Sequence, residues 1–244
     1  MIRRLDSEGM DRSRLRDCEK IRIGDVTPRR GSLFFAAPEP VMIPAAIAHL
    51  SRCDPKLARL IRKIGPIDFK PAKRRTPFAA LTRAVIGQQL SGAAATSIFK
   101  RLSTLLPSGA ALEHEEVLRL ADDTLRAAGL SWSKVATVKD MARRTADGLL
   151  PSKSRIAKMS DEEVIESLTD IRGVGRWTVE MFLIFTLGRP DVLPVDDFTV
   201  RKHFGLLHGM KTLPKPKEMS ARAEGWRPHR TTATLYLYRA ADLK

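Results

Sequence analysis

Cysteine is scarce in this 244-residue chain, which contains only Cys18 and Cys53. Two cysteines are too few for a disulfide framework, for a zinc site made of four thiolates or for an iron–sulfur cluster. The five histidines show no metal-ligand spacing of the HExxH kind. The sequence therefore predicts no metal centre built from side chains, and its cysteine usage fits a reducing compartment.

Long apolar runs are also missing. The N-terminus lacks the apolar core of a signal peptide, and no run approaches the roughly 18 apolar residues that a membrane span needs. We therefore expect a soluble cytoplasmic protein without a membrane partner.

The alternation of apolar and polar residues that is typical of strands is almost absent as well. Apolar residues instead recur at helical spacing from residue 43 onward, which predicts an all-α fold over 43–244. Residues 1–42 are rich in charge and poor in regularly spaced apolar positions, so we expect a basic, flexible leader there. In the second half of the chain, helices are expected near 113–128, 133–147, 160–169, 175–187, 198–204 and 228–242.

Basic residues are abundant: 43 Lys and Arg stand against 28 Asp and Glu, for a formal net charge of +15. The excess is concentrated in residues 41–110 and 171–244, whereas residues 111–170 are slightly acidic. A clustered positive charge predicts a polyanionic partner. The alternative is a basic face that serves solubility alone.

A glycine turn, Gly173-Val174-Gly175, lies between two predicted helices. Glycine there permits positive φ and the close approach of another backbone. Because a helix begins with unpaired N–H groups and a partial positive charge, the helix that starts at Arg176 is expected to hold a phosphate. A short GxG pattern alone is more often an ordinary turn between helices, and that interpretation is the alternative.

The carboxylate pair Asp196-Asp197 directly precedes another predicted helix. One aspartate should cap that helix, and a carboxylate held ionised there suits the stabilisation of a developing cation. The alternative is purely structural, with one aspartate as the cap and the other paired with Arg201.

Taken together, these features resemble the helix-hairpin-helix (HhH-GPD) DNA glycosylases, specifically their alkylpurine branch, the 3-methyladenine DNA glycosylases of type II. The resemblance covers about residues 45–242. It rests on FAALTRAVIGQQLSGAAA at 78–95, on LTDIRGVGRWTVEMFLIFTLGRPDVLPVDDFTVRKHFG at 168–205 and on WRPHRTTATLYLYR at 226–239.

The resemblance implies a helical fold of two lobes with a DNA-binding cleft between them, no N-terminal β domain, and the helix-hairpin-helix at about 160–188. One lobe would contain residues of about 85–190, and the other would join the earlier helices to the C-terminal ones. The implied activity is base excision: flipping of an alkylated purine of the 3-methyladenine or 7-methylguanine type out of duplex DNA, and hydrolysis of its N-glycosidic bond to leave an abasic site. The expected protein is a monomer that binds damaged double-stranded DNA, associated with the nucleoid if its source is bacterial.

The family's catalytic aspartate falls on Asp197, with Asp196 as its structural neighbour, and its task would be to stabilise an oxocarbenium-like sugar. Bifunctional relatives carry a lysine nucleophile two residues past the second hairpin glycine, where this chain has Trp177. Tryptophan cannot form a Schiff base, so the resemblance implies a monofunctional hydrolase.

The resemblance also places the base pocket and the DNA contacts. Trp177, Phe198 and Tyr238 fall where the family lines its pocket with aromatics, each with core packing as the alternative. Met181 stands where a member of this branch has a tyrosine, which leaves the preferred base open. The DNA-binding residues would be Gly173, Val174, Gly175, Arg176, Gln88, Gln89 and Leu90.

Gln89 or Leu90 is the candidate wedge that fills the gap left by the flipped base, although Leu90 could equally join the core. No cofactor is expected for the reaction. The family also holds a monovalent cation, Na⁺ or K⁺, through backbone carbonyls that map onto Thr169, Ile171 and Val174. Two alternatives remain open: a glycosylase for another lesion, such as a deaminated or etheno base, and a non-catalytic DNA-binding module.

Overall fold

The computed structural model describes residues 43–243, and these residues form helices and connecting loops without strands. The predicted all-α fold is thus confirmed. The leader expected over 1–42 lies outside the described residues. Within the described part of the chain, no helix is long and apolar enough to cross a membrane.

The chain divides into two compact units. Unit 1 is discontinuous and takes its described residues from 43–69 and 195–243, whereas unit 2 is the continuous segment 70–194. The resemblance implied this division, with one lobe made from both ends of the helical region.

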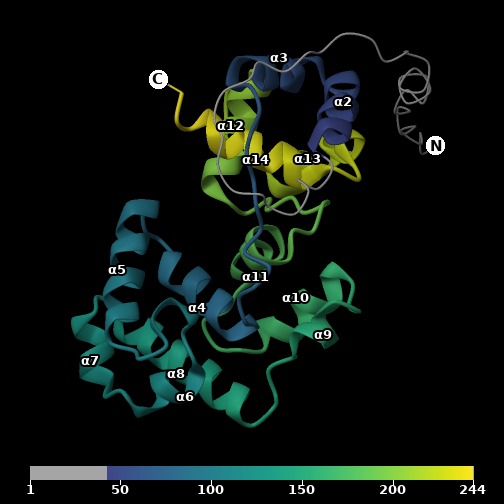
Figure 1. Ribbon diagram of the computed structural model, residues 1–244. Coiled ribbons are helices and arrows are strands. Elements are labelled where there is room, and N and C mark those ends of the chain that lie inside the picture. Colours follow the sequence, from purple (N-terminus) through teal and green to yellow (C-terminus); the bar gives the residue numbers. More distant parts are fainter. Residues whose placement is uncertain (1–42, 244) are drawn as a thin grey trace, which may run out of the picture. The chain divides into compact units, whose positions relative to one another are not determined.

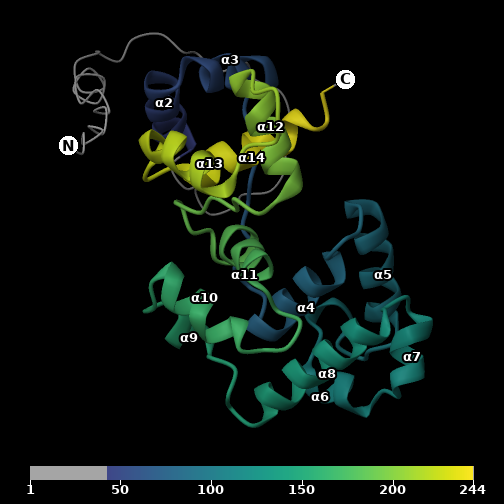
Figure 2. The same cartoon turned by 180° about the vertical axis from the view of Figure 1, so that it is seen from behind.

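Unit 1 brings its first two helices against the C-terminal helices, and both views show them side by side (Figures 1 and 2). The elements are α2 (Ile43–Cys53), α3 (Pro55–Ile64), α12 (Phe198–His208), α13 (Pro216–Arg222), η4 (Glu224–Trp226) and α14 (Arg230–Ala240). Its core includes the fully buried side chains of Leu50, Leu57, Phe204, Trp226 and Tyr236.

A polar link closes this discontinuous unit. Asp54 caps α3, because its Oδ1 accepts the N–H groups of Lys56 at 2.9 Å and of Leu57 at 3.0 Å. Its Oδ2 accepts the indole N–H of Trp226 at 3.1 Å, across 172 positions of sequence. One buried carboxylate therefore begins a helix and joins the two ends of the described chain.

Unit 2 is organised around α4, which packs against α5, α8 and α11 (Figure 1). The elements are α4 (Pro77–Gly87), α5 (Gly92–Thr104), η2 (Gly109–Ala111), α6 (His114–Arg119), α7 (Asp122–Ala127), α8 (Trp132–Ala146), α9 (Lys153–Ile156), α10 (Asp161–Thr169), α11 (Arg176–Phe182) and the π-helix η3 (Leu183–Leu187), which continues α11.

The prediction of one continuous helix near 113–128 is wrong. Residues 113–128 form two short helices, α6 and α7, with an extended Leu120 between them. The ammonium group of Lys139 donates to the carbonyls of Leu118 at 3.1 Å and of Leu120 at 2.5 Å. The break is stable because a lysine from a neighbouring helix binds the carbonyls that a continuous helix would have paired internally.

Candidate functional site

Asp197 is a buried carboxylate at the start of α12, with 8% of its surface exposed. Its Oδ1 accepts the N–H of Val200 at 2.9 Å, so Asp197 is the helix cap. Its Oδ2 accepts the hydroxyl proton of Tyr238 from α14, at 2.8 Å. Two donors from two helices thus orient a carboxylate that water reaches only slightly, as the stabilisation of a cation requires.

The other residues near this carboxylate separate the alternatives left open by the sequence. Asp196 is exposed, so the capping residue and the candidate catalytic residue are the same one. The alternative pairing with Arg201 is not what the structure shows, since Arg201 donates to the carbonyl of Pro214 at 2.8 and 3.1 Å. Phe198 is 66% exposed, so core packing is wrong for this side chain.

The hairpin lies between α10 and α11 in unit 2. Ser160 and Glu163 form a capping box at the start of α10, and Gly175 is the N-cap of α11 without a capping side chain. Gly173 has a φ of +84°, and a Cβ there would collide with Thr137 Oγ1 and lie 3.2 Å from the Cβ of Thr137. The expected need for glycine is confirmed at this position.

Gly175 differs from Gly173. Its φ is −88° and its ψ is 171°, which any residue adopts, and a Cβ there would meet nothing within 4 Å. The expectation of positive φ is therefore wrong for Gly175. Its neighbour Val174 is buried, with 2% of its surface exposed, and anchors the turn in unit 2.

Arg176, expected to contact DNA, is engaged by two carboxylates. Its Nη1 and Nη2 donate to Glu162 at 2.7 and 2.9 Å, and its Nε donates to Glu180 at 3.2 Å. The bidentate hydrogen bond to Glu162 is the largest cause of the raised pKa of Arg176, and it lowers the pKa of Glu162. The DNA contact of Arg176 stays a prediction, and these carboxylates would oppose it.

The turn after α4, Gln88 to Leu90, contains both candidate wedge residues. Gln89 has a φ of +57°, in the left-handed region that residues other than glycine rarely adopt. Leu90 is 40% exposed, which contradicts the alternative that it joins the core. The amide nitrogen of Gln88 donates within the protein, to Gly173 and Thr178.

The residues predicted for the base pocket belong to both units. Phe198 and Tyr238 lie in unit 1 with Asp197, and Trp177 and Met181 lie on α11 in unit 2. Trp177 is half-buried, and Met181 is 8% exposed.

The carbonyls expected to hold a monovalent cation lie at the end of α10 and in the hairpin. Ile171 and Val174 are buried, Thr169 is exposed, and the Ile171 carbonyl accepts the N–H of Val174 at 2.9 Å. A carbonyl oxygen has two lone pairs, so this one retains acceptor capacity. Carbonyl oxygens suit a hard cation, and the turn is compatible with the expected ion.

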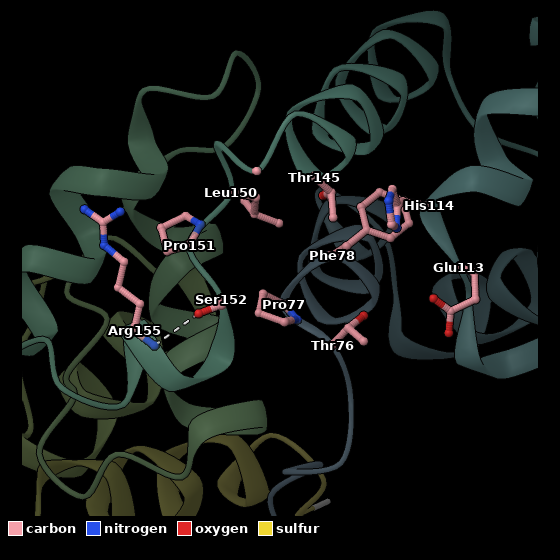
Figure 3. Close-up of a pocket in the computed structure, with 11 residues that line it drawn as sticks. Thr76, Pro77, Phe78, Glu113, His114, Thr145, Leu150, Pro151, Ser152 and Arg155 are labelled. Atoms are coloured by element: carbon pink, nitrogen blue, oxygen red, sulfur yellow. Dashed lines mark hydrogen bonds between the residues drawn. The ribbon is translucent and has the colours of Figure 1, made fainter.

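Unit 2 also has a pocket of about 470 Å³. Figure 3 shows Pro77 and Phe78 at the start of α4, His114 at the start of α6 and Arg155 of α9 around it. None of the predicted site residues lines this pocket.

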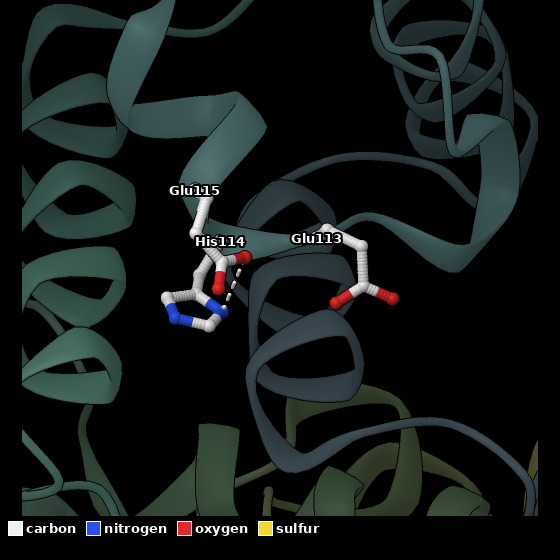
Figure 4. A group of neighbouring side chains, drawn as sticks. All are labelled: Glu113, His114 and Glu115. Carbon is white, nitrogen blue, oxygen red and sulfur yellow. Dashed lines mark ion pairs between the residues drawn. The ribbon is translucent and has the colours of Figure 1, made fainter.

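Beside this pocket, Glu113, His114 and Glu115 place their ligand atoms within 4.8 Å of one another. Figure 4 shows His114 Nδ1 paired with Glu115, at 3.1 Å. The histidines show no metal-ligand spacing in the sequence, and this group could not be found there because three consecutive residues do not form a motif. Exposed acidic groups of this kind are common without an ion, so the group does not by itself indicate a metal site.

Two further interactions were beyond sequence reasoning. The hydrogen bond between Tyr238 and Asp197 joins residues 41 positions apart. Lys134 of α8, which the sequence did not single out, donates to two carbonyls at the end of α4. A lysine in an amphipathic helix carries no signal that separates this role from an ordinary exposed position.

Comparison with known proteins places this geometry in a family. The DNA-3-methyladenine glycosylase 1 of Schizosaccharomyces pombe is 37% identical over 198 residues, covering 80% of this chain and 86% of that protein. The "alkylbase DNA glycosidase-like protein mag2" of the same yeast is 36% identical, covering 80% of this chain and 92% of that protein.

Solved structures agree with these sequence matches. The S. pombe 3-methyladenine DNA glycosylase in complex with abasic DNA aligns with a TM-score of 0.76, over 82% of this chain and 97% of that one. A DNA-3-methyladenine glycosidase from Bacillus halodurans, 33% identical, aligns with a TM-score of 0.68 over 80% and 88% of the two chains. Residues 82–228, which include the hairpin and Asp197, match the HhH-GPD superfamily of base excision DNA repair proteins, and the chain belongs to that superfamily.

Proposed function

We propose that this protein is a monofunctional DNA glycosylase that removes alkylated purines of the 3-methyladenine or 7-methylguanine type from duplex DNA and leaves abasic sites. The observation that carries this proposal is the buried Asp197 carboxylate, oriented by Tyr238 and by the start of α12. The two yeast relatives, named as a 3-methyladenine glycosylase and an alkylbase glycosidase-like protein, support the same substrate class.

The proposed reaction breaks the bond between C1′ of deoxyribose and N9 of the purine. The bonding electron pair leaves with the base, and an alkylated purine is a good leaving group because it already bears a positive charge. The sugar becomes an oxocarbenium-like cation, which the negative charge of Asp197 stabilises. A water molecule then adds to C1′ and loses a proton, so that the products are the free base and an intact strand with an abasic site.

A binding module without catalysis would need Asp197 only as the cap of α12 and would have no use for its charge close to the DNA. A carboxylate close to DNA repels phosphates, and burying it costs free energy unless it is hydrogen-bonded. The hydrogen bonds from Tyr238 and Val200 offset that cost. This arrangement favours an enzyme over the module.

Trp177 supports the monofunctional reaction. It occupies the position at which the bifunctional relatives carry a lysine nucleophile, and an indole cannot attack C1′ to form a Schiff base. We therefore expect base release without cleavage of the strand.

The aromatic residues Trp177, Phe198 and Tyr238 suit a cationic base. An aromatic face attracts a cation by about 0.5–2 kcal/mol, which favours an alkylated purine over a neutral one. Met181 supplies a flexible, polarisable side chain where a branch member has tyrosine, and the preferred lesion depends on it.

The hairpin from Gly173 to Arg176 would hold a phosphate of the DNA backbone. Thr169, Ile171 and Val174 would supply carbonyl ligands to Na⁺ or K⁺, and such an ion would add positive charge beside the phosphate. We also propose that the protein acts in the cytoplasm and is a monomer, and light scattering of the purified protein measures that oligomeric state directly.

Duplex DNA treated with a methylating agent tests this function. We expect the wild-type protein to release 3-methyladenine or 7-methylguanine and to leave strands that break only after alkaline treatment. No release from methylated DNA, together with release from duplexes that carry deaminated or etheno bases, would identify a glycosylase for another lesion. Binding without release of any base would favour the non-catalytic module.

A further inference from the structure

The candidate wedge residues stand on a turn with an unusual backbone. Gln89 has a φ of +57°, and both Gln89 and Leu90 are exposed. Such a conformation in a residue other than glycine persists only where the surroundings impose it. The function of this turn therefore depends on the groups that hold its backbone in this conformation.

Lys134 binds the backbone where the turn begins. Its ammonium group donates to the carbonyls of Ile86 at 2.9 Å and of Gln88 at 2.8 Å. The last carbonyls of a helix have no partner within the helix and carry a partial negative charge, so a cation stabilises them. Lys134 thus caps α4 from outside and binds the backbone directly before Gln89.

Gln88 links the turn to the hairpin. Its Nε2 donates to the carbonyl of Gly173 at 2.9 Å and to the Oγ1 of Thr178 at 2.8 Å. Both hydrogens of the amide group are thereby used within the protein. Thr178 is only 1% exposed and belongs to the first turn of α11, so this link reaches a rigid part of the hairpin.

The hairpin rests on the same helix that supplies Lys134. Gly173 packs against Thr137, which lies three residues after Lys134 on α8 and therefore on the same face. The contacts form a closed circuit from Lys134 to Gln88, to Gly173, to Thr137 and back along α8. Every member belongs to unit 2.

We propose that Lys134 and Gln88 are positioning residues that hold the wedge turn at a set distance from the hairpin. The inference rests on the proposed function, in which the hairpin binds a phosphate and Gln89 or Leu90 enters the gap left by the flipped base. When the hairpin is bound to the DNA backbone, this circuit of contacts aligns the wedge residue with one nucleotide. Recognition of a gap in the duplex therefore depends on Lys134 and Gln88, although neither needs to touch a base.

A merely structural role makes a different prediction. If Lys134 and Gln88 only stabilise unit 2, their loss lowers the thermal midpoint and leaves a folded variant with normal DNA recognition. If they position the wedge, folded variants lose more affinity for DNA with a gap than for undamaged duplex, because the phosphate contacts of the hairpin persist.

The test uses a duplex with a tetrahydrofuran abasic analogue and 2-aminopurine as the base opposite it, compared with an undamaged duplex. The variants are Lys134→Met and Gln88→Met, which keep side-chain length and remove the donors, and Lys134→Arg, which restores a charged donor. Lys158→Met removes an exposed positive charge elsewhere in unit 2 and serves as the control. Binding affinity, 2-aminopurine fluorescence and thermal unfolding are measured for each protein.

We expect Lys134→Met and Gln88→Met to lose about tenfold in preference for the abasic duplex, the effect of losing hydrogen bonds from a half-buried donor. The change in 2-aminopurine fluorescence on binding should decrease as well. The preference for the abasic duplex and the fluorescence change should both recover in Lys134→Arg and stay at the wild-type level in Lys158→Met. Folded variants with the wild-type preference and fluorescence change would overturn the inference.

If Lys134→Met or Gln88→Met does not fold, Thr178→Val takes its place in the test. This substitution removes one of the two acceptors of the Gln88 amide group and leaves the side-chain volume nearly constant. A reduced fluorescence change in Thr178→Val supports the inference, and a wild-type change contradicts it. Because the abasic analogue requires no chemistry, these measurements stand even if the wild-type protein releases no alkylated base.

Discussion

The hydroxyl of Tyr238 donates a hydrogen bond of 2.8 Å to Oδ2 of Asp197, while the N–H of Val200 donates to Oδ1 at 2.9 Å. Tyr238 belongs to α14 and Asp197 to the start of α12, two helices that pack together in unit 1. Both of these hydrogen bonds to the candidate catalytic carboxylate therefore lie within unit 1.

Tyr238→Phe tests this relationship. The substitution removes one hydrogen bond to the carboxylate, and such bonds to charged groups contribute about 1.5–3 kcal/mol. We expect single-turnover base release to fall by roughly tenfold to a hundredfold with little change in DNA affinity. Release at the wild-type rate would show that Tyr238 does not orient Asp197.

The two hairpin glycines should respond differently to alanine. Gly173→Ala introduces a Cβ at positive φ and against Thr137, so the free energy of unfolding should fall by about 1–3 kcal/mol or more. Gly175→Ala is compatible with its backbone and should leave that free energy nearly unchanged. If a phosphate approaches the start of α11, Gly175→Ala should weaken duplex binding. Unfolding in urea and a binding titration measure both effects, and normal binding by Gly175→Ala would exclude a close approach there.

Glu162→Gln should strengthen DNA binding. Glu162 engages Arg176 in a bidentate pair, and its removal frees Nη1 and Nη2 to approach a phosphate, while Nε stays paired with Glu180. We expect affinity to rise by roughly twofold to fivefold at low salt, the scale of an exposed ion pair, with a steeper salt dependence. Glu166→Gln on the same helix makes the same change of charge as a control. Equal effects of the two substitutions would rule out a specific role for Arg176.

The stability of unit 1 should depend on the protonation of His208. Burial lowers its pKa below the ordinary 6.5; the nearby Asp54 raises it, and Lys56 and Arg222 lower it further. The unfolded chain therefore takes up a proton first as the pH falls. The stabilising contribution is complete above about pH 6.5 and is lost as the pH falls through the lower pKa of the folded state.

The measurement for His208 is the thermal midpoint between about pH 7 and pH 5, a window set by the ordinary histidine pKa and its lowered value. The wild-type midpoint should decrease over this range, and His208→Gln should show a smaller decrease. His203→Gln, on the same helix, serves as the control and should behave as the wild type. An unchanged decrease in His208→Gln would refute the assignment.

Much of the fold could be predicted from the sequence because helical spacing of apolar residues is a local signal. The break between α6 and α7 could not, since it depends on Lys139 from a separate helix. Likewise, the sequence does not distinguish the conformations of Gly173 and Gly175, yet of the two only Gly173 has positive φ and packs against Thr137.

In the candidate site as well, local features could be predicted from the sequence and long-range contacts could not. Asp197 and the hairpin lie in contiguous motifs, which local patterns and a family resemblance reveal. The partners of those residues come from distant segments: Tyr238 reaches Asp197, and Gln88 reaches Gly173. Nothing local to Lys134 distinguishes it from a solvent-exposed lysine, and its role follows only from the carbonyls it contacts.

The most direct test of the proposed reaction compares wild-type protein with Asp197→Asn in single-turnover release of methylated bases from duplex DNA. Asparagine keeps one oxygen that can still cap α12, and its amide group can donate to the hydroxyl oxygen of Tyr238, so fold and DNA affinity should persist. Without the negative charge, we expect release to slow by at least about 100-fold, the scale of an electrostatic catalytic group. Release by Asp197→Asn at the wild-type rate would contradict the central role of this carboxylate.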